Sequence, residues 1–586
     1  MVNTKKTGTP VPASVSIRYN LVDLPTAQHK AGLAGLLLEV ESMRERGLLP
    51  ESIPQVELLD SMTAEATFTA TSLRGLFDDL YDAKKVLVES SSKWPGTTPV
   101  EQKDELDSET GKTKKVFVYE IVQPQGHFLR QFTDDGKETW HKLWRDMLWA
   151  IPRGKPTTRG PFNKRAAGES SGEGEAIWKE LLTAEKAKKK NEIVTCEVAG
   201  AILLGAQAKS AESVSFRDRV DHALLLHFWQ LAVRIFVPEQ VGADGKRKFA
   251  GYVIAIPEVA NLRQFNRRYT RALRGMGSKR SGYYPAEAVI SLPAQGALEF
   301  MDSLARLAGE ATSADSADIG RTLASVEFFH MVKAGNNVKT MVGGRVTANS
   351  DLLGAYEQIK RTCRNPSFVS ARLLALLRDK PWYAEFATMM AESPWPMFVK
   401  SQETPRMIPS FAWDARQRFE SLIQAYQHRK VQSMSKDSPK QLPSLENLVY
   451  RLVRSYVRAK TEQKSGITYA SFKGKKVKND KGGERIDYPR AYMDAQEKVC
   501  SDLFLGMRSR RDTDFVSYFT GTVGSIAQGP TLSNEADFRV IAEALLDENR
   551  RSDVQTLAML ATAAASYGSS APADEENQTE HRESAE

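Results

Sequence analysis

The chain has 586 residues, 41% of them hydrophobic and 26% charged, which is typical of a globular protein with two or three domains. Its 81 Lys and Arg residues against 73 Asp and Glu residues give a net charge of +8, so the distribution of positive charge matters more than its total. Three widely separated cysteines indicate neither a disulfide framework nor a cysteine zinc site, and no run of about 18 apolar residues appears. We therefore expect a cytoplasmic protein without a membrane partner.

The chain begins with residues 1–14, which are polar and are expected to be a flexible N-terminus. Alternating apolar residues predict a strand over residues 15–19, and a helix rich in Ala, Gly and Leu is expected to begin after Thr26. Gly32 and Gly35 on this helix indicate close packing against another part of the chain.

Residues 93–115 mix Pro, Gly and both signs of charge, and we expect an exposed loop there. The aromatic segment 140–149 predicts a core helix. Residues 151–165 then contain five cations and no acid, and the Pro and Gly residues among them predict an extended loop that suits a single-stranded nucleic-acid backbone. A solvated loop is the open alternative. The cations are Arg153, Lys155, Arg159, Lys164 and Arg165.

Residues 261–280 carry seven cations and no acid directly after an apolar segment, residues 251–256, that predicts a buried strand. On a helix, four of the arginines recur at i, i+4, i+8 and i+11 and therefore share one face, where each close like-charged pair costs roughly 0.2–0.5 kcal/mol. Such a face needs an anion, and nucleic acid fits a globular context better than a membrane surface does. The four are Arg263, Arg267, Arg271 and Arg274.

Residues 326–339, V-E-F-F-H-M-V-K-A-G-N-N-V-K, combine an apolar run with a Gly-Asn-Asn break. Glycine permits a close backbone approach, asparagine can pair with adenine, and lysine neutralises phosphate. The break therefore suits contact with both base edges and phosphates, and an ordinary turn with solvated lysines is the alternative. The residues concerned are Lys333, Gly335, Asn336, Asn337 and Lys339.

From about residue 434 onward, the segments have the period of a helix, which predicts an all-α bundle over residues 434–568. Residues 429–511 hold 20 Lys and Arg against 9 Asp and Glu, so the bundle is expected to have a basic face that includes Arg451, Arg454, Arg458, Arg508, Arg510 and Arg511. The fold class is therefore α+β: a large mixed domain over residues 15–430 and the bundle. Residues 569–586 are acidic and predict a disordered tail.

Signatures of catalysis are weak. None of the eight histidines belongs to an HxH pair or an HExxH helix, and neither a phosphate-binding P-loop nor a G-x-S-x-G motif occurs. We therefore expect no catalytic residue, no metal ligand and no cofactor, and an enzyme is the less favoured class.

Five segments resemble one known family: L-P-T-A-Q-H-K-A-G-L-A-G-L, L-L-H-F-W, G-Y-Y-P-A-E-A-V-I-S-L-P, H-M-V-K-A-G-N-N-V-K and M-R-S-R-R followed by D-F-V-S-Y-F-T-G-T. Their order and number resemble the large subunit of type I CRISPR Cascade complexes, in the Myxan-like type I-B branch. The resemblance extends over roughly residues 15–566.

The resemblance implies a non-enzymatic subunit in antiviral defence that binds the 5′ end of the guide RNA, recognises the protospacer-adjacent motif (PAM) in duplex DNA and aids R-loop formation. It implies as partners the guide RNA, the target duplex and its displaced strand, and the backbone, 5′-handle-binding and small subunits. A helicase-nuclease or transposition proteins would be recruited. The helical bundle resembles the small subunit and in this branch is a candidate for separate synthesis, here from Met434.

Together with the resemblance, the residue patterns assign Asn336 and Asn337 to motif reading and Lys333 and Lys339 to phosphate. Two alternatives stay open. One is a free-standing metal-dependent nucleic-acid-processing enzyme, and the other is a basic scaffold that binds proteins only.

Overall fold

The computed structural model describes residues 14–94, 96–106, 113–132, 138–150, 159–198, 204, 216–241, 247–306, 318–334, 337–399, 410–432, 444–478, 484–525 and 535–567. The chain forms two compact units: unit 1 comprises Met1–Glu239 and Phe249–Leu353, and unit 2 comprises Gln240–Lys248 and Gly354–Glu586. Among the described residues, no helix is both long and apolar enough to cross a membrane.

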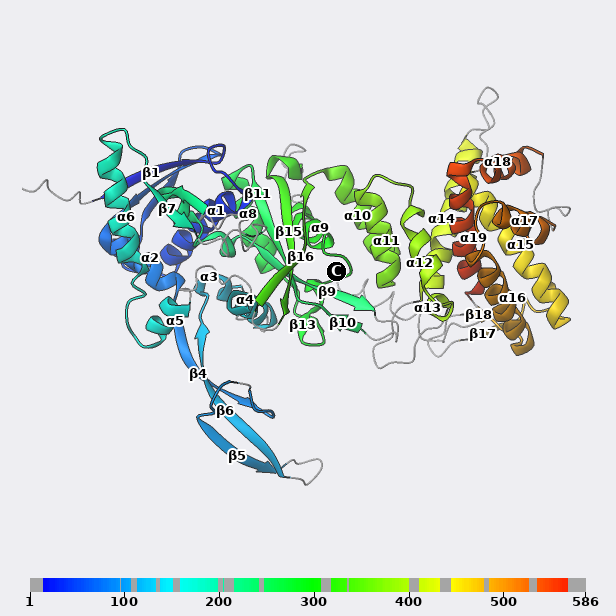
Figure 1. Ribbon diagram of the computed structural model, residues 1–586, viewed down its shortest axis with the longest axis horizontal. Helices are drawn as coiled ribbons and strands as arrows, with labels where there is room; N and C mark the ends of the chain where they lie inside the picture. The colour runs from blue at the N-terminus through cyan, green and yellow to red at the C-terminus, as the bar shows by residue number, and fades with distance from the viewer. Residues whose placement is uncertain are drawn as a thin grey trace, which may run out of the picture. The chain divides into compact units, whose positions relative to one another are not determined.

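Helix α1 (Ala27–Glu45) is the central helix of unit 1 (Figure 1). Fifteen of its 19 residues are buried, so other elements enclose it on nearly all sides. It contacts helix α7 (Val220–Leu225), the short turn η2 (Trp229–Leu231) and strand β11 (Tyr252–Val259). A Cβ atom on Gly32 would overlap the carbonyl oxygen of Leu225, and one on Gly35 that of Phe228, which confirms the predicted close packing.

Polar side chains fix the start of α1. Thr26 accepts the backbone N–H of His29, and the His29 ring lies 2.7 Å from both Thr26 Oγ1 and Asp218 Oδ2. Burial raises the pKa of the Asp218 carboxyl, but hydrogen bonds from His222 and His29 outweigh this effect and hold the pKa well below its usual range. Lys30, the next residue on α1, pairs with Glu258 at 2.9 Å.

The main sheet of unit 1 has the order β10-β9-β11-β15-β16, and β14 (Val289–Ile290) pairs with β9 in parallel. Residues 253–256 of β11 are all buried, so both faces of the sheet are covered there. Helix α9 (Gln295–Ala305) contacts β11, β15 and β16. The other bounds are β9 (Arg234–Val241), β10 (Arg247–Phe249), β15 (Leu323–Ala334) and β16 (Asn337–Thr347).

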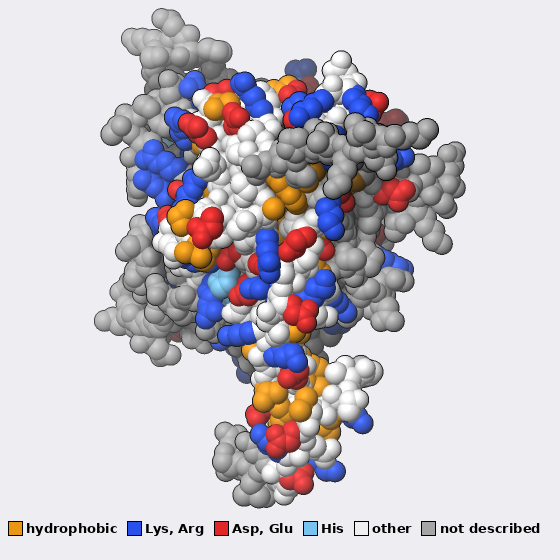
Figure 2. Space-filling view, turned by 90° about the vertical axis from the view of Figure 1, so that its left-hand side faces the viewer, with side chains coloured by type: hydrophobic (Ala, Val, Ile, Leu, Met, Phe, Trp, Pro, Cys, Tyr) orange, Lys and Arg blue, Asp and Glu red, His pale blue; other side chains and the backbone are white. Residues whose placement is uncertain are grey.

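Unit 1 also contains two three-stranded antiparallel sheets, with the orders β1-β3-β2 and β4-β6-β5. The second extends away from the rest of unit 1 (Figures 1 and 2), and the Trp94 and Tyr119 rings stack 4.2 Å apart on it. The predicted loop over residues 93–115 is therefore wrong in part, because cross-strand pairing outweighs its loop-like composition. The strands are β1 (Val15–Asn20), β2 (Gln55–Leu58), β3 (Thr63–Phe68), β4 (Ala83–Ser90), β5 (Glu101–Leu106) and β6 (Thr113–Pro124).

The remaining helices of unit 1 flank these sheets. The aromatic helix is present as α4 (Glu138–Ala150), and its Trp140 and Trp144 are buried as predicted for a core helix. Further helices of unit 1 are α2 (Ala70–Leu80), α3 (His127–Arg130), α5 (Arg159–Ala166), α6 (Glu173–Lys188) and α8 (Leu262–Arg274).

Unit 2 is mostly helical, and the described residues of its C-terminal part add only the short pair β17 (Lys476–Lys478) and β18 (Glu484–Ile486). Helix α19 (Glu548–Ser566) contacts α14, α15, α16 and α18, and its small buried residues allow this close packing. The other helices are α10 (Ser350–Thr362), α11 (Pro366–Leu377), α12 (Ala387–Glu392), α13 (Pro396–Val399), α14 (Phe411–Gln432), α15 (Leu445–Ser465), α16 (Arg490–Arg508), α17 (Asp512–Thr522) and α18 (Glu535–Leu546).

The α+β fold class, with a mixed N-terminal part and a mostly helical C-terminal part, is confirmed. The compact units divide at Leu353, and helices α11–α14 fall in unit 2. A separate bundle over residues 434–568 stays a prediction. Residues 1–13 and 568–586, which include all but residue 14 of the predicted flexible terminus and the whole predicted tail, lie outside the described residues.

Replacing Gly32 by Ala should destabilise unit 1 by at least about 2 kcal/mol, because the new methyl group overlaps the Leu225 carbonyl. Thermal unfolding of the two proteins measures the loss. Gly354→Ala is the matched control: a Cβ there meets nothing within 4 Å in a helix, so it should leave stability unchanged or raise it slightly. Equal melting temperatures for wild type and Gly32→Ala would contradict the close approach.

Asp218→Asn should lower stability near neutral pH by roughly 1–3 kcal/mol, because the carboxylate accepts hydrogen bonds from two histidines. Because the pKa of Asp218 is lower in the folded state than in the unfolded state, its carboxylate stabilises the fold at pH values above the unfolded-state pKa of about 3.9. This contribution is lost as the pH falls through the folded-state pKa. The difference from wild type should therefore shrink in acid, as measured by denaturant unfolding at several pH values. Asp23→Asn, at an exposed site, is the control.

Candidate nucleic-acid interface

Helix α8 positions the predicted arginine face. It begins after Asn261, whose side-chain oxygen accepts the N–H of Gln264 at 2.9 Å, as an N-cap residue does. Its apolar side is anchored in the core, where the Tyr269 hydroxyl donates to the Val233 carbonyl at 2.8 Å. The opposite side therefore faces outward, and it carries Arg263, Arg267, Arg271 and Arg274.

The four arginines of this face, hereafter the α8 stripe, differ in their contacts. Arg263 and Arg267 are exposed, and neither forms an ion pair with a described residue. Arg274 is exposed and places its guanidinium 6.0 Å from the Phe132 ring centre. Arg271 is half-buried. The prediction that these arginines share one face agrees with the structure, in which three of the four are exposed. Two of them, Arg263 and Arg267, are not neutralised by an acid of the described chain.

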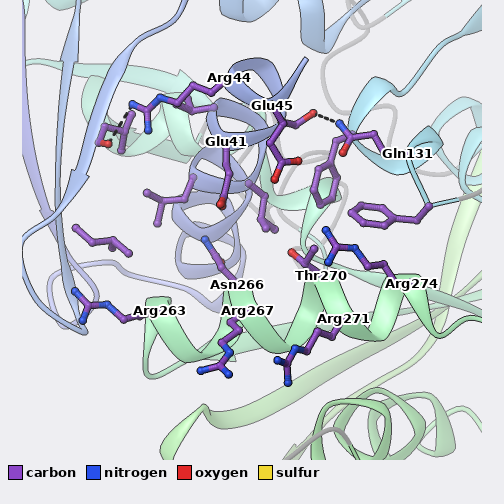
Figure 3. A pocket seen from close by; sticks show the side chains of 18 residues that line it. Glu41, Arg44, Glu45, Gln131, Arg263, Asn266, Arg267, Thr270, Arg271 and Arg274 are labelled. Carbon is purple, nitrogen blue, oxygen red and sulfur yellow. Dashed lines mark hydrogen bonds between the residues drawn. The ribbon is translucent and has the colours of Figure 1, made fainter. Parts of the chain in front are cut away.

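The α8 stripe borders a cleft of about 790 Å³ (Figure 3). Helix α1 forms the opposite wall and contributes Glu41 and Glu45, while α3 and β2 contribute apolar side chains. Asn266 and Thr270 point from α8 toward α1, whereas Arg267 and Arg271 point away from it. The acidic wall was not predicted from the sequence, because these glutamates lie more than 200 positions from the arginines and only the packing of α1 against α8 brings them together.

The Gly-Asn-Asn segment connects a β-hairpin. β15 and β16 pair from Ser325 with Thr347 to Ala334 with Asn337, so only positions 335 and 336 join the strands. Phe328 and Phe329 lie opposite Gly344 and Gly343, where the missing side chains leave room for the phenyl rings.

Three of the five residues predicted for this segment lie near the end of the hairpin in the described chain. Lys333 and Asn337 belong to the two strands, and Lys339 on β16 is exposed. Gly335 and Asn336 lie outside the described residues. Residues 339–343 of β16 are all exposed, and they include Met341 at 59% and Val342 at 48%. The hairpin therefore presents an exposed outer strand.

The predicted cationic loop over residues 151–165 is partly wrong. Residues 159–166 form helix α5, and Arg153 and Lys155 lie outside the described residues. Pro161 does not break the helix, because a proline in the first turn removes no intrahelical hydrogen bond. Phe162 is buried against Tyr81, which anchors α5.

The cations of α5 also differ in their contacts. Arg165 pairs with Asp82 at 3.2 Å and donates to the Asp78 carbonyl. Arg159 and Lys164 remain exposed. The surface that α5 offers to an external anion is therefore smaller than a fully extended cationic loop would offer.

Four of the six arginines predicted for the basic face of unit 2 contact other groups of the described chain. Arg451 lies 3.8 Å from Asp537, and Arg458 pairs with Glu462 at 3.1 Å and stacks on Tyr469. Arg508 donates to the Ala391 carbonyl, and Arg510 lies 3.6 Å from Asp514. Arg454 and Arg511 are exposed, and neither pairs with an acid of the described chain. Close pairing weakens the predicted basic face, and two cations of it stay available.

A second face of the molecule carries mixed charge. On the face shown in Figure 2, Lys and Arg side chains alternate with Asp and Glu side chains. Among the described residues, no three His, Cys, Asp or Glu side chains lie close enough to hold a metal ion together. The α8 stripe with its cleft and the β15–β16 hairpin are therefore two candidate binding surfaces in unit 1.

Two protein-family models match the chain. The type I-B CRISPR Cas8b N-terminal domain matches residues 53–314, and the type I-B CRISPR Cas8b C-terminal domain matches residues 323–565. None of the curated proteins compared with the chain matches it. The two family matches span nearly the whole sequence, in the expected order, and confirm the resemblance drawn from the five motifs. The chain belongs to the Cas8b family and is a large subunit of the type I-B CRISPR Cascade complex.

Proposed function

We propose that this Cas8b subunit acts without catalysis: it binds the 5′ end of the guide RNA, recognises the PAM in duplex DNA and aids R-loop formation. The observation that carries the proposal is the α8 stripe, in which Arg263 and Arg267 are exposed without an acidic partner in the described chain. Like charges held on one helix face repel one another, and a polyphosphate backbone removes that repulsion and releases its counterions.

The β15–β16 hairpin suits PAM recognition. A two-stranded β-ribbon fits the major groove of B-DNA, which is about 12 Å wide, and base edges can be read there. We assign Asn336 and Asn337 to the bases, Lys333 and Lys339 to flanking phosphates, and Gly335 to a close backbone approach. The support for this assignment is the position of the pair Ala334–Asn337 at the end of the ribbon and the exposure of Lys339.

The hairpin and the α8 stripe are separate surfaces of unit 1. Val259, the last residue of β11, pairs with Leu323, the first residue of β15. Helix α8 begins three residues after Val259, so it starts near the beginning of β15. The hairpin end lies 11 residues farther along β15, a span of roughly 36 Å. The two surfaces can therefore contact different nucleic-acid segments, with the motif at the hairpin and a backbone at the stripe.

Unit 2 would contact the displaced strand mainly through Arg454 and Arg511, which lack acidic partners in the described chain. Paired arginines such as Arg451 and Arg458 would contribute less, because a bound phosphate must compete with their carboxylates. On unit 1, Arg159 and Lys164 of α5, together with Arg153 and Lys155, would bind a nucleic-acid backbone separately. Guide RNA, target DNA, the other Cascade subunits and a recruited helicase-nuclease or transposition machinery are the proposed partners.

The two alternatives have distinct signatures. A metal-dependent nucleic-acid-processing enzyme would turn over DNA or RNA when a divalent metal is added. A scaffold for proteins only would bind nucleic acid weakly, with an affinity that does not fall as salt rises.

The double variant Arg263→Gln/Arg267→Gln should bind nucleic acid less tightly and with a shallower salt dependence. Each lost phosphate contact reduces the slope of log affinity against log salt by about 0.9 for duplex or about 0.7 for single strands, so the double variant should lose roughly 1.4–1.8. Fluorescence anisotropy over a salt series measures both quantities. Arg361→Gln/Arg539→Gln removes two arginines that are 74% and 78% exposed, and it should change the slope less. An unchanged slope in the stripe variant would disprove the phosphate role.

Asn336→Ala should abolish discrimination between functional and non-functional PAMs while Cascade assembly stays intact. One bidentate base contact contributes roughly 1–3 kcal/mol of discrimination, so binding to the functional motif should fall to the level of the others. Lys339→Gln is the matched control and should weaken binding about equally on all motifs. Binding of the assembled complex to a panel of duplexes tests both variants. If Asn336→Ala weakens binding to every duplex equally, the base-reading role of Asn336 is wrong.

A further inference from the structure

The cleft between α1 and α8 has two walls of opposite charge (Figure 3). Glu41 and Glu45 lie on α1, are exposed and form no ion pair with a described residue. Arg263 and Arg267 on the other wall are likewise unpaired. Although both sets line one cleft, they do not neutralise each other. The cleft thus offers separate anionic and cationic positions to a ligand that carries both hydrogen-bond donors and a negative charge.

Asn266 provides the second observation. Only 9% of this residue is exposed, and its Oδ1 atom is buried without a hydrogen-bond partner. Its side chain points from α8 toward Glu41 across the cleft (Figure 3). A buried acceptor oxygen without a partner costs free energy, and a water or ligand group that donates to it removes this cost. The geometry therefore indicates a polar ligand between Asn266 and the glutamates.

The rest of the cleft suits a flat organic group. Its volume of about 790 Å³ lies within the range of roughly 300–1,000 Å³ that is usual for small-ligand sites. Val40, Leu58 and Phe132 contribute apolar surface, and the Arg274 guanidinium lies against the Phe132 ring. Aromatic rings and guanidinium groups are the surfaces on which unpaired bases stack.

We propose that this cleft binds one unpaired guanine nucleotide of a single-stranded nucleic acid. The guanine N1–H and one N2–H donate to a carboxylate of Glu41 or Glu45, the second N2–H donates to Asn266 Oδ1, and the phosphate lies at the α8 edge of the cleft beside Arg263 and Arg267. The proposal rests on the proposed function of the α8 stripe and adds a base-specific site to it. A guanine in a duplex cannot bind here, because its Watson–Crick edge is already paired.

Guanine fits better than the other bases because of its pattern of donors. Its two adjacent N–H donors can bind both oxygens of one carboxylate, and hydrogen bonds to a charged acceptor are stronger than neutral ones. Adenine and cytosine offer only an exocyclic amino group to that carboxylate. Uracil presents one N–H between two carbonyl oxygens, which the glutamates repel. The unpaired glutamates thus select guanine and reject uracil.

Saturation-transfer NMR with the full-length protein tests the proposal, with guanosine 5′-monophosphate and uridine 5′-monophosphate as probes. We expect the uridine nucleotide to bind about tenfold more weakly, since a bidentate base contact contributes that much or more. Glu41→Gln/Glu45→Gln should remove the preference for guanine. Glu51→Gln/Glu192→Gln removes two other exposed carboxylates and should leave it intact. Asn266→Ala should also reduce the preference, and its melting temperature shows whether the fold is kept.

Two further outcomes separate this inference from the function on which it rests. Equal binding of both nucleotides, or a guanine preference that survives Glu41→Gln/Glu45→Gln, would overturn the guanine site. If oligonucleotide affinity still depended on Arg263 and Arg267, the phosphate role of the α8 stripe would stand. Conversely, Arg263→Gln/Arg267→Gln should weaken the binding of both nucleotides to the same extent, because both carry the phosphate.

Discussion

The close approach of α1 to the backbone of residues 225–228 is the constraint on which unit 1 depends. Gly32 and Gly35 leave no side chain between the helix and the carbonyl groups of Leu225 and Phe228, so α1 can sit where the main sheet, α7 and α8 all contact it. The same position sets α1 opposite α8 across the cleft. Packing at two glycines therefore determines the distance between the glutamates and the arginines.

The described arginines fall into two classes. Several, such as Arg165 and Arg458, pair with acids and help to hold the fold. Others, such as Arg263, Arg267 and Arg454, are exposed without such partners. An excess of eight positive charges over 586 residues is modest, so it is the second class that creates local positive potential. A count of cations along the sequence cannot distinguish the two classes.

At the β15–β16 hairpin, the boundary between the two family matches differs from the boundary between the two compact units. The two family matches meet between residues 314 and 323, immediately before β15. Yet β15 pairs with β11 over eight residues, so the first strands of the C-terminal match complete the sheet of unit 1. A change in the hairpin therefore acts on a surface held by both halves of the sequence, because the sheet joins them through continuous backbone hydrogen bonds.

The sequence by itself determined the properties that depend on local periodicity: the α+β class, the helix at residues 262–274 with its arginines on one face, and the tightly packed glycines of α1. It also carried the motifs that led to the family. Tertiary structure decided which cations are free, that Glu41 and Asn266 face each other, and that residues 101–106 form a strand instead of a loop. These features depend on contacts between segments far apart in the chain. Local composition does not determine them, because strand pairing and ion pairing both depend on the position of a second segment that is distant in the sequence.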